Sequence, residues 1–558
     1  MSFVLRIGGE AGWGIASASD IFARLAIKLG YYVFASKDYA SQIRGGHNNH
    51  TIRISKNQVL ADINEINILL ALDQTTLDLH LKNVKKNGII LIDDKTTSED
   101  SRIITIPLKK IEKKLNEKNI HNAVFLGATA KSLNIPFQLL QEVIEEFFKK
   151  KPELAEKIVK AAQEAFNVTN NVQDLPKIGE SQNQEFITGN EAIAKGALKA
   201  GLTFHAQYPM TPATGILHYL AKEAVSNDKL TVVQPEDEIA VINFALGASA
   251  VGARAMCATS GGGFALMVES LGLAGMAEIP LVIVNGQRPG PATGLPTKNA
   301  QGDLKFVLSA APGDFPRVVI APGNIEECYT ETKRALYLAE KYQLPVIVLI
   351  DKHLCESFQT VNLPESEFTF DYDKRINIIQ EIDENDLNED GLYKRYQNES
   401  LKRPLPATAI FTYAGDEHDE VGYITENPEI ATKMNNRRMN KLNLIKVELP
   451  KPELIGEKEA DLTIVSWGSN KGAIIEAINK VKDKKINFLS INFLSPFQDE
   501  VKAILENAKD LFLIEANYSA QLGSLIREKT GVEIENKYLR YDGKVFTVDD
   551  IYKKLKEL

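Results

Sequence analysis

Short runs of β-branched and aromatic residues alternate with amphipathic segments along almost the whole chain. FVLRI is followed by IFARLAIKLG, VVQPEDE by IAVINFALGASAVG, and the apolar runs PLVIVNG, PVIVLID and LFLIEAN recur further on. This alternation is typical of βαβ units built around buried parallel sheets. Because 558 residues are too many for one hydrophobic core, the sequence predicts a multi-domain α/β protein.

Composition and charge exclude several classes of protein. The chain is 44% hydrophobic and 25% charged, and no apolar run approaches the roughly 20 residues of a membrane-spanning helix. Its beginning, MSFVLRIGGEAGWG, lacks the pattern of a secretory signal, so we expect a cytoplasmic protein that does not enter a membrane. A net charge of -9 argues against nucleic-acid binding, which requires clustered Lys and Arg.

The residues that most often bind metals are few and scattered. Cys257, Cys328 and Cys355 lie far apart without a CxxC pair, so this chain alone predicts neither a disulfide framework nor an iron-sulfur cluster. His47 and His50 stand three residues apart, but no third ligand follows at a useful spacing. We therefore predict packing or surface histidines and no metal site in this chain.

Two polar interruptions divide the chain. The first, at about 149–185, is rich in lysine and reads as a linker, and the second, at about 359–458, is rich in Asp, Glu and Asn and reads as a connecting segment. The expected parts are residues 1–180, 186–365, 366–455 and 456–558.

Glycines near the N-terminus suggest a ligand loop. Gly9 and Gly12 belong to a turn between the first strand and a helix, where backbone amides can approach a phosphate. Arg44 and Gly45 belong to a second loop, in which a guanidinium beside glycines can hold an anion. A purely structural turn explains either loop equally well.

The motif YPMTPAT lies between two predicted helices. Its prolines stiffen the loop, and Thr211 and Thr214 offer hydroxyl groups at the entry of the second helix. The residues alone favour Thr211 as the N-cap of that helix over a hydroxyl that faces a ligand.

Three acids, Glu236, Asp237 and Glu238, stand at the start of a long apolar helix. Glu236 and Asp237 complement the helix dipole. Glu238 leads into the part that must pack inside, where a buried carboxyl has a raised pKa and exchanges protons near neutrality.

Two further strands end in polar and glycine-rich turns, where open α/β sheets place their ligands. Ser260 and Gly261 follow one strand, and Arg288 follows the other in a turn rich in Pro and Gly. A guanidinium there suits bidentate recognition of a carboxylate, or it pairs with a surface acid. The next segment, GLPTKNAQGDL, is expected to form the rim of the site with Thr297, Lys298 and Gln301.

Glu417, His418 and Asp419 lie in a stretch of high charge density, AGDEHDEVGYITENPEIATKMNNRRMNKL. The charges alone favour a solvated acidic loop that runs into a basic helix, rather than a catalytic group.

These motifs together resemble the fused large subunit of 2-oxoacid:ferredoxin oxidoreductases. GGEAGWG and RGG resemble the gamma domain of that family, YPMTPAT its YPITPS motif, GLPTKNAQGDL its GxPTxxxQxDL segment, and the EHDE stretch its GxEHxxxG segment. Glu238 precedes Gly247 by nine residues, as the cofactor-activating glutamate of the family does. The resemblance implies a gamma-type domain (1–180), a thiamine-diphosphate pyrimidine-binding domain (186–365), a connecting segment (366–455) and a transketolase C-terminal-like domain (456–558).

The resemblance also implies a role for each candidate residue. Glu238 would activate thiamine diphosphate through the pyrimidine N1′, and Thr211 and Arg288 would contact the substrate. The thiamine side would further include Tyr208, Pro209, Ser260 and Gly261. The coenzyme A side would include Gly9, Gly12, Arg44 and Gly45.

The implied activity is the alpha-subunit half of a coenzyme-A-acylating oxidation of a 2-oxoacid, with ferredoxin as electron acceptor. No GDG motif for the diphosphate occurs in the chain. The resemblance assigns that motif, Mg²⁺ and a [4Fe-4S] cluster to a smaller beta subunit, in a dimer of alpha-beta pairs. GLPTK and EHDE favour 2-oxoglutarate as substrate. The alternatives are pyruvate, branched-chain or aryl 2-oxoacids, and, more distantly, a non-catalytic binding protein of pyrimidine-domain fold.

Overall fold

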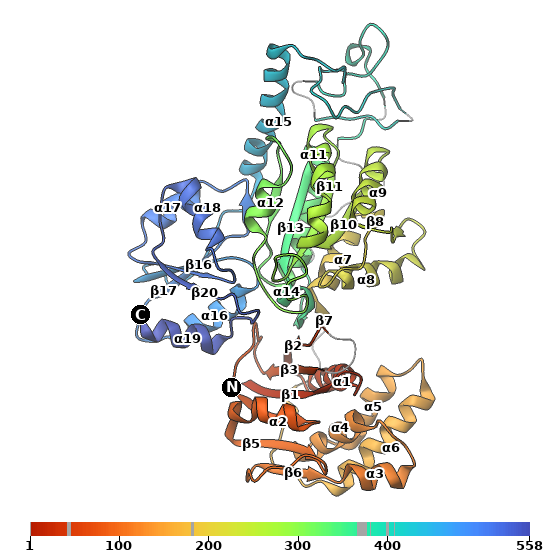
Figure 1. Cartoon of the computed structure of the whole chain (residues 1–558), viewed down its shortest axis with the longest axis vertical. Helices are drawn as coiled ribbons and strands as arrows, with labels where there is room; N and C mark the ends of the chain where they lie inside the picture. Colours follow the sequence, from red (N-terminus) through yellow and green to blue (C-terminus); the bar gives the residue numbers. More distant parts are fainter. Residues whose placement is uncertain are drawn as a thin grey trace. The chain divides into compact units, whose positions relative to one another are not determined.

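The structure is a computed structural model that describes residues 2–41, 46–179, 184–364, 377–379, 381–397, 401–406 and 408–558 (Figure 1). It contains two compact units. Unit 1 comprises Met1–Ile187, Ser357–Asn362 and Thr547–Leu558, and unit 2 comprises Thr188–Glu356 and Leu363–Phe546. The predicted multi-domain α/β class is confirmed, because three separate sheets alternate with helices. The two units do not correspond one to one with the four expected parts, whose boundaries stay a prediction.

Unit 1 is built on an eight-stranded sheet with the order β6-β5-β4-β1-β3-β2-β14-β7. Its strands are β1 (Ser2–Glu10), β2 (Tyr32–Asp38), β3 (His47–Ser55), β4 (Ile66–Ala71), β5 (Val84–Asp93), β6 (Ile103–Ile106), β7 (Glu185–Thr188) and β14 (Phe358–Val361). β1, β4, β5 and β6 pair in parallel, whereas β3 pairs antiparallel with both β1 and β2. The expectation of parallel sheets thus describes half of this sheet, because the segment between Asp38 and His47 is shorter than the roughly dozen residues that a parallel crossover needs.

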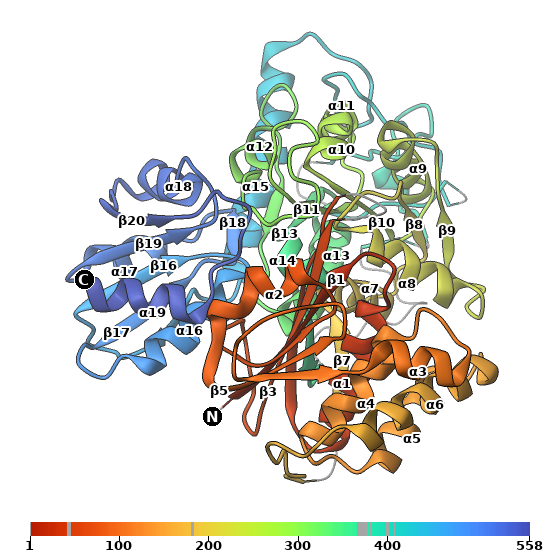
Figure 2. The same cartoon turned by 60° about the horizontal axis from the view of Figure 1, so that its bottom comes forward.

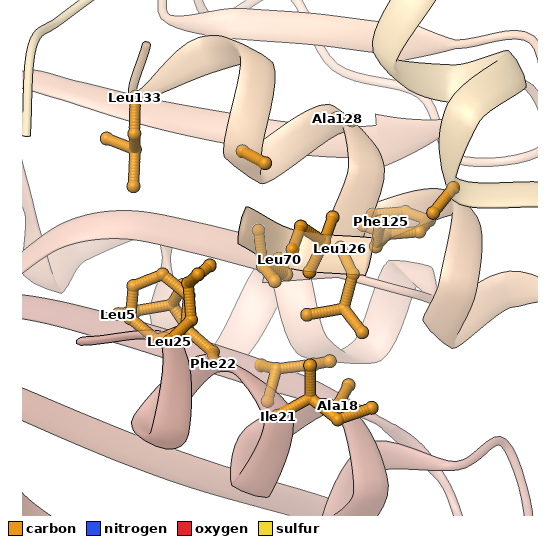
Figure 3. Close-up of a cluster of buried hydrophobic side chains, with 14 of the residues drawn as sticks. Leu5, Ala18, Ile21, Phe22, Leu25, Leu70, Phe125, Leu126, Ala128 and Leu133 are labelled. Carbon is orange, nitrogen blue, oxygen red and sulfur yellow. The ribbon is translucent and has the colours of Figure 1, made fainter. Parts of the chain in front are cut away.

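The helices of unit 1 are α1 (Ile15–Lys28), α2 (Gln74–His80), α3 (Leu108–Leu115), α4 (His121–Ser132), α5 (Phe137–Phe147), α6 (Pro152–Val168) and α19 (Val548–Glu557), with a 3-10 turn, η1 (Leu81–Asn83). The core forms where α1 and α4 meet the sheet. Figure 3 shows Ile21 and Phe22 of α1 with Leu126 of α4, close to Leu5 and Leu70 of β1 and β4. The C-terminal helix α19 belongs to the same unit, and Val548 N donates a hydrogen bond to Asp62 O at 3.0 Å.

The linker expected at about 149–185 is wrong for its first half. Residues 152–168 form α6, which packs closely on α4. A Cβ at Gly127 of α4 would lie 1.9 Å from Ala162 O of α6, so only glycine permits this approach. The buried face of α6 is mostly alanine, which gives a weak apolar signal in a lysine-rich sequence.

Unit 2 contains a seven-stranded sheet with the order β18-β12-β13-β11-β10-β8-β9. Its strands are β8 (Phe204–Ala206), β9 (Thr231–Val233), β10 (Ala255–Ser260), β11 (Leu281–Gln287), β12 (Val318–Ile320), β13 (Pro345–Asp351) and β18 (Phe493–Ser495). All its pairings are parallel except that of β18 with β12. Its helices are α7 (Gly189–Lys199), α8 (Thr214–Ala224), α9 (Glu238–Ala250), α10 (Gly261–Leu266), α11 (Val268–Met276), α12 (Leu304–Ser309), α13 (Ile325–Tyr342) and α14 (Lys352–Glu356). The carboxyl ends of β8, β10 and β11 therefore meet at one edge.

A five-stranded sheet, β15-β17-β16-β19-β20, also belongs to unit 2 (blue in Figure 2). Its strands are β15 (Glu453–Gly456), β16 (Leu462–Ser466), β17 (Ile486–Ser490), β19 (Leu511–Glu515) and β20 (Asn536–Leu539), accompanied by α16 (Asn470–Lys480), α17 (Glu500–Glu506) and α18 (Gln521–Thr530).

The segment expected to connect the domains contains the 3-10 turn η2 (Glu384–Asp386) and the long helix α15 (Pro428–Glu448). Across the described ranges, no helix is long and apolar enough to cross a membrane.

Candidate active site

Glu238 stands at the N-terminus of α9, directly after the turn that follows β9. The Asp237 side chain caps the helix and accepts a hydrogen bond from Ala240 N at 2.9 Å, a more specific contact than the complement to the helix dipole expected of this acid. Glu236 is exposed, whereas Glu238 is 3% exposed. Of the three acids, only Glu238 is thus buried.

The surroundings of the Glu238 carboxyl favour its protonated form. Burial raises its pKa and Asp237 adds to the rise, while its own backbone amide, the Thr259 hydroxyl and Arg288 oppose it. Among the described residues, no group hydrogen-bonds its Oε1. A Cβ at Gly263 would lie 2.5 Å from Oε1 and 2.1 Å from Thr259 Oγ1. Glycine at 263 therefore leaves the space that the carboxyl occupies.

Thr211 and Arg288 meet at the same edge of the sheet. Thr211 precedes Pro212 through a cis peptide bond, and Arg288 Nη1 donates a hydrogen bond to Thr211 O at 2.8 Å. Helix α8 begins only at Thr214, with Ala213 at its N-cap position, so the alternative that Thr211 caps this helix is wrong. Arg288 forms no ion pair with any residue that the structure describes, which leaves its guanidinium able to meet an incoming carboxylate.

The other predicted thiamine-side residues lie around this cluster. Ser260 ends β10, and its buried hydroxyl has no hydrogen-bond partner within the described part of the chain. Gly261 begins α10, where a Cβ would lie 2.5 Å from Asp303 Oδ2. Tyr208 and Pro209 lie on the exposed loop between β8 and Thr211. Their contact with a ligand stays a prediction.

The predicted rim position of Gln301 is wrong, because this side chain is 0% exposed and fully hydrogen-bonded. Its Nε2 donates to Asp351 Oδ2 and Trp467 O, both at 3.1 Å. Its Oε1 accepts from Asn470 Nδ2 at 2.9 Å and from Ala516 N at 3.0 Å. Gln301 therefore joins the loop before α12 to both sheets of unit 2. No spacing in the sequence indicated these partners.

Replacing Gln301 with leucine should lower the free energy of unfolding by about 3 kcal/mol, because several buried polar groups lose their partner at once. Urea unfolding of the purified chain measures this change. Gln521→Leu is the matched control, since Gln521 of α18 also bonds the loop before α12, donating to Gly302 O, but does so at the surface. Equal losses in the two variants would contradict the role given to Gln301.

The N-terminal loop is only partly described. Gly9 is the second-last residue of β1, and a Cβ there would lie 3.0 Å from Leu72 Cβ. Gly12 has φ 95°, and a Cβ at this position would meet no atom within 4 Å. Arg44 and Gly45 lie outside the described residues. A coenzyme A site at this loop stays a prediction.

His47 forms a histidine pair with His80 in unit 1. Its Nε2 lies 3.0 Å from Nε2 of His80, and Arg6 Nη1 lies 3.3 Å from Nδ1 of His80. Within the described ranges, no group of three or more His, Cys, Asp or Glu side chains is arranged to bind a metal ion.

The solvated loop expected around Glu417 is wrong at two of its positions. His418 is 0% exposed, and its ring lies 4.0 Å from that of Tyr396, measured between centroids. Arg438 of α15 is buried and donates to both carboxylate oxygens of Glu417, at 2.9 and 2.5 Å. The EHDE segment is thus fastened to α15 by a bidentate ion pair.

A second buried ion cluster lies beside it. Glu278, which is 1% exposed and has φ 52°, forms ion pairs with Arg437 and Lys441 of α15. Arg395 Nη2 donates to Glu278 O at 2.9 Å. Burial alone would raise the pKa of Glu278, but Lys441, Arg437 and Arg395 outweigh it and hold the pKa well below its usual range. α15 is therefore held to the end of α11 by charge.

Comparison with known proteins identifies the domains that carry this geometry. Residues 195–436 match the family model of the pyruvate flavodoxin/ferredoxin oxidoreductase thiamine-diphosphate-binding domain. Residues 4–168 match that of pyruvate ferredoxin/flavodoxin oxidoreductase. The first match contains Thr211, Glu238 and Arg288, and the second contains the glycine loop after β1.

Relatives and a solved structure match nearly the whole chain. A 2-oxoacid:ferredoxin oxidoreductase subunit alpha from Sulfolobus sp is 32% identical over 98% of this chain and 95% of its own length. The 2-oxoglutarate synthase subunit KorA of Methanocaldococcus jannaschii is 35% identical over 60% of this chain and 88% of its own. The 2-oxoglutarate:ferredoxin oxidoreductase from Magnetococcus marinus is 31% identical with a TM-score of 0.89, over 100% of this chain and 99% of that one. The chain therefore belongs to the alpha subunits of the 2-oxoacid:ferredoxin oxidoreductase family.

Proposed function

We propose that this chain is the alpha subunit of a thiamine-diphosphate-dependent enzyme that oxidatively decarboxylates 2-oxoglutarate and forms its acyl-coenzyme A while reducing ferredoxin. The observation that carries the proposal is the buried Glu238 carboxyl, whose Oε1 has no hydrogen-bond partner among the described residues and whose pKa is raised. An aminopyrimidine nitrogen is a suitable partner for such a carboxyl. Gly263 supports this role of Glu238, since any side chain at position 263 would occupy the space next to Glu238 Oε1.

The residues around Glu238 would divide the work of the site. Bound thiamine diphosphate supplies the carbanion chemistry of 2-oxoacid decarboxylation. Glu238 would hold or release a proton at the pyrimidine ring, and Ser260 and Gly261, at the end of β10, would lie on the same side with Tyr208 and Pro209. Arg288 would bind a carboxylate or carbonyl oxygen of the substrate, beside Thr211, whose backbone oxygen it contacts.

The choice of 2-oxoglutarate rests on the relatives. The Magnetococcus enzyme has 2-oxoglutarate, coenzyme A and succinyl-CoA bound, and the Methanocaldococcus relative is a 2-oxoglutarate synthase subunit. Coenzyme A would bind at the glycine loop of unit 1, at Gly9 and Gly12 with Arg44 and Gly45. The four-part division into gamma-type, pyrimidine-binding, connecting and C-terminal segments belongs to the same proposal.

A beta subunit would complete the site with the diphosphate-binding motif, Mg²⁺ and a [4Fe-4S] cluster. Burial raises the pKa of the thiols of Cys257, Cys328 and Cys355, which disfavours the thiolates that a cluster requires. Helix α9, which begins at Glu238, carries Ile239 and Phe244, each 50% exposed. An apolar helix face beside the site fits a partner subunit, and we propose a dimer of alpha-beta pairs.

The test is to purify the chain with its beta subunit and to measure coenzyme-A-dependent reduction of a low-potential dye. The substrates are 2-oxoglutarate, pyruvate and branched-chain 2-oxoacids. The highest kcat/KM is expected with 2-oxoglutarate. A higher value with pyruvate or a branched-chain 2-oxoacid would overturn the substrate proposal, and a complex inactive with all of them would overturn the activity.

A further inference from the structure

Asp303, which none of the proposed roles uses, is tied to the end of β11 through two hydrogen bonds. Its Oδ2 accepts from Asn285 Nδ2 at 3.1 Å, and its backbone N donates to Gln287 Oε1 at 3.0 Å. Asn285 and Gln287 are both 0% exposed and, two residues apart on one strand, lie on the same face of the sheet. Arg288 is the next residue, so Asp303 holds the strand end from which the guanidinium projects.

The Asp303 carboxylate has little room to move. A Cβ at Gly261 would lie 2.5 Å from Asp303 Oδ2 and 3.0 Å from its Cγ, so the carboxylate packs against the backbone at the start of α10. Two residues earlier, Gln301 fixes the same loop to Asp351 and to Asn470 of α16. Leu304 begins α12 directly afterwards. The Asp303 carboxylate thus lies in a short segment that is held by Gln301 on one side and by helix α12 on the other.

Asp303 also acts on the charge of Arg288. The Asp303 and Glu238 carboxylates both favour the charged guanidinium, which burial disfavours. Burial raises the pKa of Asp303, while the hydrogen bond from Asn285 and the charge of Arg288 oppose that rise. Among the described residues no ion pair within 4 Å joins the two, so the guanidinium is attracted by Asp303 without direct contact and can meet another carboxylate.

We propose that Asp303 is a positioning residue, which fixes the end of β11 and holds the Arg288 guanidinium ready for the carboxylate of the 2-oxoacid. The inference rests on the proposed function and extends it to a residue outside the thiamine-contacting set. Asp303 acts through Arg288 and does not touch the reacting atoms. Its loss should therefore appear mainly in the KM for the 2-oxoacid.

The experiment uses the complex with the beta subunit and compares four variants, Asp303→Ala, Asp303→Asn, Arg288→Ala and the double variant Asp303→Ala/Arg288→Ala. Asp303→Ala should raise the KM for 2-oxoglutarate about tenfold, the effect of losing a charge-assisted hydrogen bond. Asp303→Asn keeps an acceptor for Asn285, so its rise in KM should be several-fold smaller than that of Asp303→Ala. Asp228→Ala, an exposed aspartate on a surface turn, is the matched control.

Coupling separates a positioning role from a general loss of structure. If Asp303 acts through Arg288, the KM of the double variant should stay within about twofold of that of Arg288→Ala. The dissociation constant of thiamine diphosphate, measured by isothermal titration calorimetry, should not change in Asp303→Ala. If Asp303→Ala does not fold, Asp303→Asn alone decides, through its KM and the same calorimetric titration.

Three outcomes would overturn the inference. The first is a KM within twofold of the wild type in both Asp303 variants. The second is a KM of the double variant that equals the product of the two single effects. The third is loss of thiamine diphosphate binding together with substrate binding. A wild-type complex that oxidises no 2-oxoacid would overturn the proposed function itself. An active wild type with unchanged Asp303 variants would overturn only the inference.

Discussion

Replacing Glu238 with glutamine should lower coenzyme-A-dependent oxidation of 2-oxoglutarate by at least about 100-fold, the usual scale for removing a general acid-base group. Glutamine keeps the size of the side chain and fits beside Gly263, but it cannot exchange a proton at the buried position. The measurement is kcat/KM of the complex with the beta subunit, assayed by dye reduction. The expected loss lies in kcat, because Glu238 is not the substrate-binding group.

Glu236→Gln provides the matched control for this prediction. Glu236 lies two residues earlier in the same turn and carries the same side chain, but it is exposed. Its substitution should leave kcat/KM within about twofold of the wild type, since exposed substitutions away from a site have small effects. Equal activity of Glu238→Gln and wild type would remove the residue from the catalytic machinery and with it the main support of the proposed function.

The same carboxyl predicts a pH dependence of stability. Because the pKa of Glu238 is raised in the folded chain, the unfolded chain releases this proton first. The contribution of Glu238 to the free energy of unfolding therefore falls as the pH rises above the ordinary glutamate pKa of 4.5 and through the raised value. Glu238→Gln does not titrate, so its unfolding temperature should exceed that of the wild type at pH 8. A lower unfolding temperature there would contradict the burial argument.

The parts of the site that could be predicted are those whose signal is local. A strand that ends in acids and continues as an apolar helix places Glu238 at an edge of the sheet, and Asp237 lies at the N-terminus of that helix. A turn after a buried strand likewise placed Arg288. These positions follow from residues within one βαβ unit.

The parts that could not be predicted depend on partners distant in the sequence. Gln301 was expected at the rim, but its side-chain partners lie 50 to 215 residues away. The contact of Asp303 with Asn285 spans 18 residues across a loop, and nothing in either residue type requires it. Helix α6 was missed because a buried alanine face gives little contrast with its surroundings. Sequence periodicity reports burial along one element, whereas these features arise from contacts between elements.

Replacing Glu278 with glutamine should lower the free energy of unfolding by about 3–5 kcal/mol, the cost of leaving buried charges without their partner. Glutamine occupies the same space, so the loss comes from the charges of Arg437 and Lys441, both of which pair with this single carboxylate.

The control for Glu278→Gln is Glu420→Gln, which breaks an ion pair with Lys433 whose side chains are 38% and 47% exposed and which should cost at most about 1 kcal/mol. Urea unfolding of both variants measures the difference. Because the free energy of a buried ion pair depends on both partners, Glu278→Gln combined with Lys441→Met should recover part of the loss. If the double variant is less stable than Glu278→Gln alone, unpaired charge is not the reason for the loss, and the packing of α15 against the end of α11 must account for it.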